Sequence, residues 1–435
     1  MLVPCCASAT PLRVQRPRVA CRGGQRGGEE APISPSRKQG GRPATFTEDQ
    51  AGRARLAALS AGLSAGVAHL SSTAIGAAAL LPVAVGAALG VLVAHSIEHD
   101  PPPGLCVIIT GGTKGIGKAL AREFLWRGDR VLITGRHSAS ALEAVTSLRQ
   151  QTGCPPDAIT AAVADCSDPR AMSAMVDALG TAGHVDMFIC NAGCSGAYKA
   201  FEDADACVLD EVISSTLGCS VLCAHAALRT FSEQRRRGGA RGTLWLTDGA
   251  GSGGDATPMY AAYGSAKAGV RQFARSLQAE GPPSAAVGLL SPGMVLTELL
   301  LQGATPRNKA AFNALAEQPE TCAAQLVPAL RRAHGRAMAE PQSRLPHLRV
   351  LTIPRAAMRL AMLPMLRNRY FSADGRPTYP PEEERIAALA AQRKRERVVG
   401  AARRGGSGAA STGAQVAVLA LAVLASLALS CLPLP

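Results

Sequence analysis

Aromatic side chains are scarce in this sequence of 435 residues, at 3% of the total, although 47% of the residues are hydrophobic. Acidic residues are missing from the start of the chain, where five arginines precede Glu29, the first acid. A basic, acid-free start without a long apolar run is typical of an organelle transit peptide and argues against a secretory signal. We therefore expect residues 1–45 to be a transit peptide without a fold of its own, with an ordinary disordered tail as the alternative.

Closely paired cysteines are also missing, because the 13 cysteines form no C-x-x-C pair and no spacing typical of a metal site. This pattern is typical of cysteines that act as small apolar side chains in a reducing compartment, so we expect no metal site. A basic stripe interleaved with aromatic residues is missing as well, since the arginines behind the net charge of +14 gather near the two ends. This pattern favours targeting and contact with a membrane surface over binding of nucleic acid.

Charged residues are absent from one long block, between Leu56 and Ile97. One membrane span needs about 20 apolar residues, so residues 54–97 are predicted to form a membrane segment of one or two helices. An alanine-rich helical arm in water is the alternative. A second charge-free block follows the basic run around Arg393, and residues 414–433 are predicted to form a C-terminal membrane helix.

Between these blocks, apolar strands alternate with amphipathic helices over residues 104–300, which predicts an α/β fold with a doubly wound parallel sheet. A first strand at Leu105–Thr110 runs into a glycine-rich loop, the arrangement that lets backbone amides approach a pyrophosphate. A second strand at Arg130–Thr134 precedes Arg136, where sites for NAD usually carry an acid. Arg136 and Lys114 would instead hold a 2′-phosphate, so NADPH is the expected cofactor and NADH the less favoured one.

Beyond residue 300 the pattern predicts helices without a strand, in a helical extension on the substrate side over residues 301–390. Pro306 and Pro319 are typical start signals for two of these helices. The apolar stretch Pro354–Leu366 is compatible with core packing, with a lid or with a patch that contacts a membrane.

Tyr263 and Lys267 are the candidate catalytic pair. They stand four residues apart, so their side chains share one face of a helix. An ammonium beside a phenol stabilises the phenolate and lowers the pKa of the phenol. The pair therefore predicts a proton donor and acceptor for a carbonyl/alcohol couple.

These motifs, in this order, resemble the short-chain dehydrogenase/reductase family. The resemblance implies that Tyr263 donates a proton to the carbonyl oxygen and that Lys267 binds the nicotinamide ribose and depresses the pKa of the tyrosine. It also implies roles around the cofactor, with the glycines at the pyrophosphate, Asp165 at the adenine and Thr297 at the nicotinamide carboxamide. The residues implied to bind the cofactor are Gly111, Thr113, Lys114, Gly115, Ile116, Gly117, Arg136, Asp165, Asn191, Gly193, Lys267 and Thr297.

Two positions depart from the family pattern. The place of the usual carbonyl-polarising serine, counted back from the tyrosine, holds Ala250. We expect Ser252 to polarise the carbonyl, with Asp248 in the place of the usual loop serine. Thr216 stands where the family commonly has an asparagine that anchors a proton-relay water, so either the threonine hydroxyl holds that water or the relay is altered.

The loop Asp248–Gly254 and the segments Ser291–Leu301 and Gln318–Pro328 are similar to one plant and algal branch of the family, the chlorophyll(ide) b reductases of the non-yellow-colouring type. This likeness covers about residues 103–384. It implies reduction of the 7-formyl group of chlorophyll b or chlorophyllide b by NADPH, the first step in chlorophyll b degradation, at the chloroplast thylakoid membrane. Light-harvesting complex proteins and a homologous reductase subunit are the further implied partners.

Two other functions remain open from the residues alone. One is a membrane-anchored reductase of a long-chain ketone or steroid in the endoplasmic reticulum. The other is a non-catalytic scaffold for the turnover of light-harvesting proteins, although the presence of both Tyr263 and Lys267 argues against it.

Overall fold

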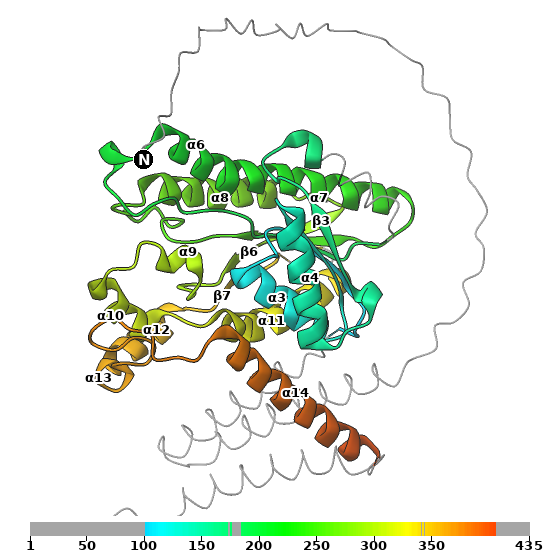
Figure 1. The fold of residues 1–435 in the computed structure, drawn as a ribbon. Helices are drawn as coiled ribbons and strands as arrows, with labels where there is room; N and C mark the ends of the chain where they lie inside the picture. Colours follow the sequence, from blue (N-terminus) through cyan, green and yellow to red (C-terminus); the bar gives the residue numbers. More distant parts are fainter. Residues whose placement is uncertain (1–100, 173–174, 176–183, 341, 343, 406–435) are drawn as a thin grey trace, which may run out of the picture. The chain divides into compact units, whose positions relative to one another are not determined.

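The computed structural model describes residues 101–172, 175, 184–340, 342 and 344–405, and Figure 1 shows their fold. The predicted transit peptide and both predicted membrane segments, 54–97 and 414–433, lie outside the described residues.

Seven parallel strands form one sheet in the order β3-β2-β1-β4-β5-β6-β7. Strands β1, β4 and β5 are apolar and almost wholly buried, because helices cover both faces of a parallel sheet. The strand order reverses between β1 and β4, which opens a crevice at the carboxyl ends of the strands. The predicted doubly wound sheet is confirmed. The strands are β1 Cys106–Ile109, β2 Arg130–Gly135, β3 Ile159–Val163, β4 Met187–Cys190, β5 Gly242–Thr247, β6 Ala285–Ser291 and β7 His347–Arg349.

The helices form a layer on each side of the sheet (Figure 1). On one side α3, α4 and α11 bury leucines and alanines against the strands in one apolar cluster. On the other side α7 and α8 do so in a second cluster, and α6 packs on α8. The bounds are α3 Gly115–Trp126, α4 Ser138–Thr152, α6 Ala206–Ile213, α7 Cys219–Arg236, α8 Ala261–Glu280 and α11 Pro319–Ala339, with a π-helical turn at Ser214–Gly218 between α6 and α7.

One continuous helix in the described part of the chain, Ala206–Arg236, is long and apolar enough to cross a membrane by length and composition. It combines α6, the π-helical turn and α7. Its side chains Cys223, Ala227 and Phe231 are buried in the second apolar cluster against the sheet. We therefore assign it to the core of the domain.

The expectation that no strand follows residue 300 is wrong. Strand β7 pairs in parallel with β6, with Leu348 beside Leu290, and it extends the sheet at its edge. Three residues are too few for an alternating pattern, so the strand depends on the free edge of β6. Pro306 and Pro319 do begin helices, as predicted. The remaining helices are α9 Glu298–Leu301, α10 Pro306–Leu315, α12 Ile353–Ala361, α13 Leu363–Leu366 and α14 Glu382–Gly405.

Helix α11 belongs to the core of the sheet domain. It packs along α3, and its Arg331 forms a buried ion pair with Asp129, the residue before β2. Arg331 also donates to the carbonyl of Pro102 at 3.1 Å. Removing one partner of a buried pair leaves the other charge uncompensated, at a cost of about 3–5 kcal/mol. Helix α11, which follows residue 300, is therefore part of the same domain as strands β1 and β2.

Candidate active site

The glycine-rich loop after β1 is shaped for a close approach by an anion. Gly111 and Gly115 have φ angles of +63° and +58°, which favour glycine. A Cβ on Gly117 would lie 2.3 Å from the carbonyl oxygen of Gly111. Helix α3 starts here, its N-cap Lys114 makes no side-chain capping bond, and its first turn has no acid. Its amide groups are free of side-chain caps, so the loop fits a pyrophosphate.

Asn191 fixes the position of this loop. Its side-chain Nδ2 donates to the carbonyl oxygens of Thr110 at 3.0 Å and Gly111 at 3.3 Å. Its backbone N–H donates to the Thr110 hydroxyl at 3.0 Å. Asn191 therefore joins the ends of β1 and β4.

Two further loop residues, Thr113 and Ile116, support the loop by packing. A Cβ on Gly135 would lie 2.6 Å from Cγ2 of Thr113, so the end of β2 lies directly against that threonine. Ile116 packs against the apolar cluster beneath α3. Both side chains contact other residues of the same domain, so they support the backbone of the glycine-rich loop.

Two exposed cations lie at the rim of the loop, each paired with an acid. Lys114 Nζ is 2.6 Å from Glu298, and Arg136 Nη1 is 3.0 Å from Glu211. Exposed pairs of this kind contribute about 0–1 kcal/mol, so a phosphate could displace the carboxylates at low cost. Asp165 faces the same rim, and hydrogen bonds from Ser167 lower its pKa. This carboxylate is therefore ionised beside Arg136.

The segment after β6 closes over the glycine-rich loop. A Cβ on Gly115 would lie 3.2 Å from Cγ2 of Thr297, the residue that precedes α9. The ion pair between Lys114 and Glu298 joins the same two segments. The structure therefore brings Thr297 to the glycine-rich loop.

Tyr263 and Lys267 lie in the first turns of α8. Lys267 Nζ donates to the carbonyl oxygen of Thr247, the last residue of β5, at 2.9 Å, and burial lowers the pKa of the lysine to about 8. The Tyr263 ring centroid is 5.7 Å from that nitrogen. Burial, with a smaller contribution from Asp248, raises the pKa of Tyr263 to about 12.

This is the opposite of the lowered tyrosine pKa expected from the sequence. The ammonium of Lys267 is directed at a backbone carbonyl, so loss of water around the phenol dominates. Without cofactor the tyrosine is therefore fully protonated at neutral pH, which suits a proton donor.

Asp248 is the centre of a buried polar network that the sequence did not reveal. Its Oδ2 lies 3.0 Å from His347 Nε2 and accepts from the Ser252 hydroxyl at 3.2 Å. The Ser291 hydroxyl contacts Asp248 and lies 2.7 Å from the same His347 nitrogen. Burial acts to raise the pKa of Asp248, but hydrogen bonds from His347 and Ser291 outweigh it and leave the pKa below its ordinary value. The network therefore holds a carboxylate.

The same loop borders the tyrosine hydroxyl. A Cβ on Gly249 would lie 2.8 Å from the Tyr263 hydroxyl, so only glycine fits between Asp248 and the catalytic pair. The charge of Asp248 acts to raise the pKa of both Tyr263 and Lys267. Ser252, the expected carbonyl-polarising residue, donates a hydrogen bond to Asp248 in this arrangement. His347 was missed because it lies on β7, the strand without a sequence pattern.

Thr216 lies in the π-helical turn and is fully buried. Its hydroxyl donates to the carbonyl oxygen of Cys194 at 3.0 Å and accepts from the backbone N–H of that residue at 3.3 Å. A Cβ on Gly193 would lie 3.2 Å from the same hydroxyl oxygen. Thr216 therefore holds the turn after β4.

A small apolar pocket lies beside Tyr263. The Tyr260 ring centroid is 6.4 Å from that of Tyr263 and 5.0 Å from that of Tyr198. Met259 has a φ of +68°, an unusual backbone for a residue with a side chain, directly before these rings. The position of Tyr260 beside Tyr263 could have been suspected from its place three residues before it in the sequence. The lining includes Ser195, Val208, Val212, Met259, Tyr260 and Tyr263.

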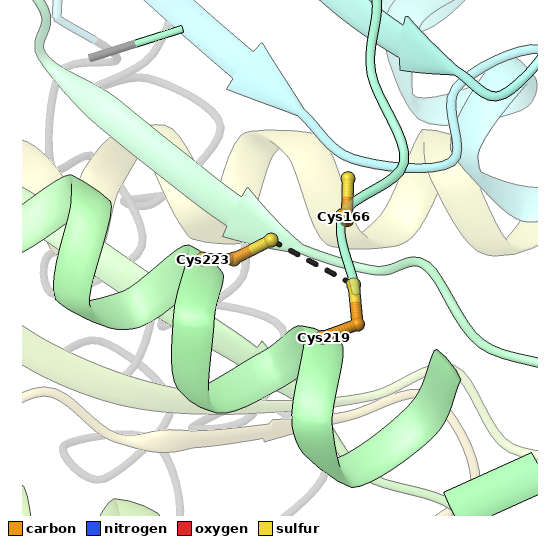
Figure 2. A group of neighbouring side chains, drawn as sticks. All are labelled: Cys166, Cys219 and Cys223. Atoms are coloured by element: carbon orange, nitrogen blue, oxygen red, sulfur yellow. Dashed lines mark hydrogen bonds between the residues drawn. The ribbon is translucent and has the colours of Figure 1, made fainter. Parts of the chain in front are cut away.

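Three buried cysteines lie close together, as Figure 2 shows. The Sγ atoms of Cys166, Cys219 and Cys223 lie within 4.8 Å of one another, and those of Cys219 and Cys223 are 3.7 Å apart. Metal ligation requires thiolates. Hydrogen bonding to Cys166 raises the pKa of Cys219 and of Cys223, and all three residues pack in the second apolar cluster. The same contacts act in the opposite direction on Cys166, because hydrogen bonds from Cys219 and Cys223 lower its pKa to about 3. At most one of the three sulfurs is therefore a thiolate, and we assign the three residues to the apolar core. Their convergence was not apparent from the sequence.

Comparisons with known proteins agree with this geometry. Residues 105–306 match the short chain dehydrogenase family. The chain is 36% identical to a probable chlorophyll(ide) b reductase NYC1, chloroplastic, of Oryza sativa subsp. japonica, over 72% of this chain and 62% of the relative. It is 37% identical to a chlorophyll(ide) b reductase NOL, chloroplastic, of the same plant, over 62% of this chain and 78% of the relative. The crystal structure of gox2181 superposes with a TM-score of 0.50 and 25% identity, covering 58% of this chain and 96% of that one.

The extent of these matches sets what they show. The chain spans about 60% of the length of the first curated relatives that it matches, at 62% and 59%. It spans 78% of the NOL relative at 37% identity, and the family match covers the glycine-rich loop, the Tyr263–Lys267 pair and Thr297. A nicotinamide cofactor follows from this family, and the glycine-rich loop fits one. The chain therefore belongs to the short-chain dehydrogenase/reductase family, among the homologues of the chlorophyll(ide) b reductases.

Proposed function

We propose that this protein reduces the 7-formyl group of chlorophyll b or chlorophyllide b to a hydroxymethyl group, the first step in chlorophyll b degradation. The observation that carries the proposal is the protonated Tyr263 beside a buried Lys267, at the carboxyl end of a sheet whose glycine-rich loop fits a dinucleotide. The names of the relatives supply the substrate.

The nicotinamide cofactor supplies the hydride in this family. Tyr263 donates the proton to the carbonyl oxygen, because its phenol remains protonated at neutral pH. Lys267 is placed to bind the nicotinamide ribose, with Thr247 orienting its ammonium. The remaining residues shape the cofactor loop and its rim.

Asp248 bears on proton donation by Tyr263. A buried carboxylate near Tyr263 disfavours a second negative charge on the substrate oxygen. Proton donation by Tyr263 would therefore keep negative charge off the substrate oxygen. Ser252 acts through Asp248 in this arrangement, by donating to its Oδ2.

NADPH is the proposed form of the cofactor. Lys114 and Arg136 lie at the rim of the loop in exposed pairs that a 2′-phosphate could displace. The proposed location is the chloroplast thylakoid membrane, supported by the chloroplastic relatives and by the charge-free blocks at 56–97 and 414–433. Light-harvesting complex proteins and a homologous reductase subunit are the proposed partners.

The test is a pigment assay with the full chain in detergent. Chlorophyll b and chlorophyllide b are incubated with NADPH, and the products are separated by chromatography and identified by mass and absorption. We expect both to gain two hydrogens at the 7-formyl group. A long-chain ketone and a ketosteroid are assayed in parallel, and turnover of these with none of the pigments would overturn the proposal. No turnover of any carbonyl would support the scaffold alternative.

A further inference from the structure

Helices α12 and α13 expose an unusual amount of apolar surface. The described part of the chain has fifteen large exposed apolar side chains, and six of them lie between residues 353 and 365. Ile353 is 81% exposed and Met365 is 79% exposed. We call this surface the α12–α13 face and define it by the side chains of Ile353, Met358, Leu360, Met362, Leu363 and Met365.

The polar side of α12 is turned inward and is held there. Arg359 and Arg369 both pair with Glu317, whose side chain is buried. The Tyr370 hydroxyl donates to Glu317 Oε2 at 3.1 Å. Rotation of α12 to bury its apolar residues would break the ion pair between Arg359 and the buried carboxylate of Glu317, at a cost in free energy. The apolar side chains therefore stay outside.

The α12–α13 face is continuous with the segment that covers the active site. An apolar cluster joins Leu296, from the segment before α9, to Phe312 on α10 and to Tyr370 after α13. Helix α12 in turn packs on α10. Thr297, which touches the cofactor loop, directly follows Leu296. Helix α12 is therefore linked to the active site through α10 and the segment that holds Leu296 and Thr297.

The charge of this region favours one kind of partner. Residues 341–373 contain six arginines and no acid. Glu317, which lies between α10 and α11, neutralises part of that positive charge by pairing with Arg359 and Arg369. Arg367 is exposed beside α13. Exposed apolar residues, several of them flexible methionines, next to arginines are typical of helices that lie in the interface of an anionic bilayer.

We propose that the α12–α13 face lies in the headgroup region of a bilayer that contains anionic lipids. Interfacial helices bury their apolar side by about 5–10 Å. This contact would hold the segment that contains Leu296 and Thr297, which lies over the glycine-rich loop, close to the lipid. It deepens the proposed function, because a pigment with a lipid tail could then reach Tyr263 without crossing water.

Tryptophan fluorescence in vesicles tests the contact directly. The chain has two tryptophans, Trp126 and Trp245, and both are buried, so a third is a distinct reporter. Met365→Trp is compared with Val221→Trp, which lies on α7 across the sheet and is 36% exposed. The full chain is reconstituted in vesicles of phosphatidylcholine and phosphatidylglycerol, with and without bromine on the acyl chains near the headgroup. We expect brominated lipid to quench most of the added emission of the first variant and none of the second.

Equal emission of Met365→Trp in both kinds of vesicle would overturn the proposal. So would a blue shift that depends on protein density and not on bromine, because it would indicate a second copy of the chain on this face. Quenching that is the same with neutral lipid alone would remove the anionic part of the proposal. The assay contains no pigment and no cofactor, so its failure would leave the proposed reaction untouched.

A kinetic arm rests on the proposed function. In Met358→Gln/Met365→Gln we expect a higher KM for chlorophyll b presented in vesicles. The KM for chlorophyllide b in solution, and kcat for both, should stay unchanged, because neither side chain touches the site. An equal rise for both pigments would indicate a structural defect and contradict the role of the face.

Discussion

The cofactor half and the catalytic half of the site are built by different means. Around the glycine-rich loop the site is formed by the backbone, through two positive φ angles and contacts that leave no room for a Cβ. Around Tyr263 the site depends on the buried side chains of Lys267 and Asp248, with His347 beside Asp248. Backbone shape follows from local sequence, whereas a charge network needs residues from distant strands. The first half is therefore the one that the family motif predicts, and the second is where this chain departs from it.

The largest expected effect is on the catalytic half alone. Tyr263→Phe removes the proton donor, and general acid catalysis contributes about 10²–10⁴-fold. We expect kcat for pigment reduction to fall by that factor, while NADPH affinity measured by cofactor fluorescence stays the same. A variant that keeps its activity would show that the proton comes from another group.

The second effect is on the cofactor half alone. Gly117→Ala places a Cβ 2.3 Å from the Gly111 carbonyl oxygen, so the loop must open. We expect NADPH affinity to fall about a hundredfold, equal to about 2.7 kcal/mol. Gly335→Ala is the matched control, because the nearest atom to its Cβ would be 3.9 Å away. Similar affinities of both variants would remove the close-approach argument.

Cofactor choice is expected to change less. Arg136→Asp replaces a cation at the rim with an acid, so the ratio of kcat/KM for NADPH to that for NADH should fall about tenfold or more. Arg275→Asp, at an exposed position on α8, makes the same charge change away from the rim. An unchanged ratio in the first variant, or an equal change in both, would place the 2′-phosphate elsewhere.

The pH dependence connects the two halves. Burial lowers the pKa of Lys267 to about 8, so reduction should slow as pH rises through about 8 and the ammonium is lost. Asp248 acts to raise that pKa, and Asp248→Asn should therefore move the alkaline limb to lower pH, by about one unit. The measurement is kcat/KM against pH for both proteins. A limb that stays in place would show that Asp248 does not act on Lys267.

The smallest effect is expected at Ser252. Its hydroxyl donates to Asp248, one of several contacts to that carboxylate. We expect Ser252→Ala to lower kcat less than about threefold, since a neutral hydrogen bond contributes about 1 kcal/mol or less here. A loss near a hundredfold would instead support the direct polarisation of the carbonyl that the sequence suggests. Ser265→Ala, at an exposed hydroxyl on α8, is the control.

The sequence predicted the sheet and the cofactor loop well for a physical reason. Buried parallel strands are continuous apolar runs, and glycine is favoured where φ is positive, so both leave a local signal. Strand β7 left none, because it has three residues and depends on the edge of β6. With it the sequence missed His347, and hence the state of Asp248.

The Tyr263–Lys267 pair was determined by the sequence itself, since a spacing of four residues on a helix fixes a shared face. The direction of their pKa shifts was not. Burial of the phenol and the hydrogen bond from Lys267 to the Thr247 carbonyl arise only when α8 packs on the sheet. Local spacing determines which groups meet, whereas desolvation and partners contributed by distant segments decide how those groups are charged.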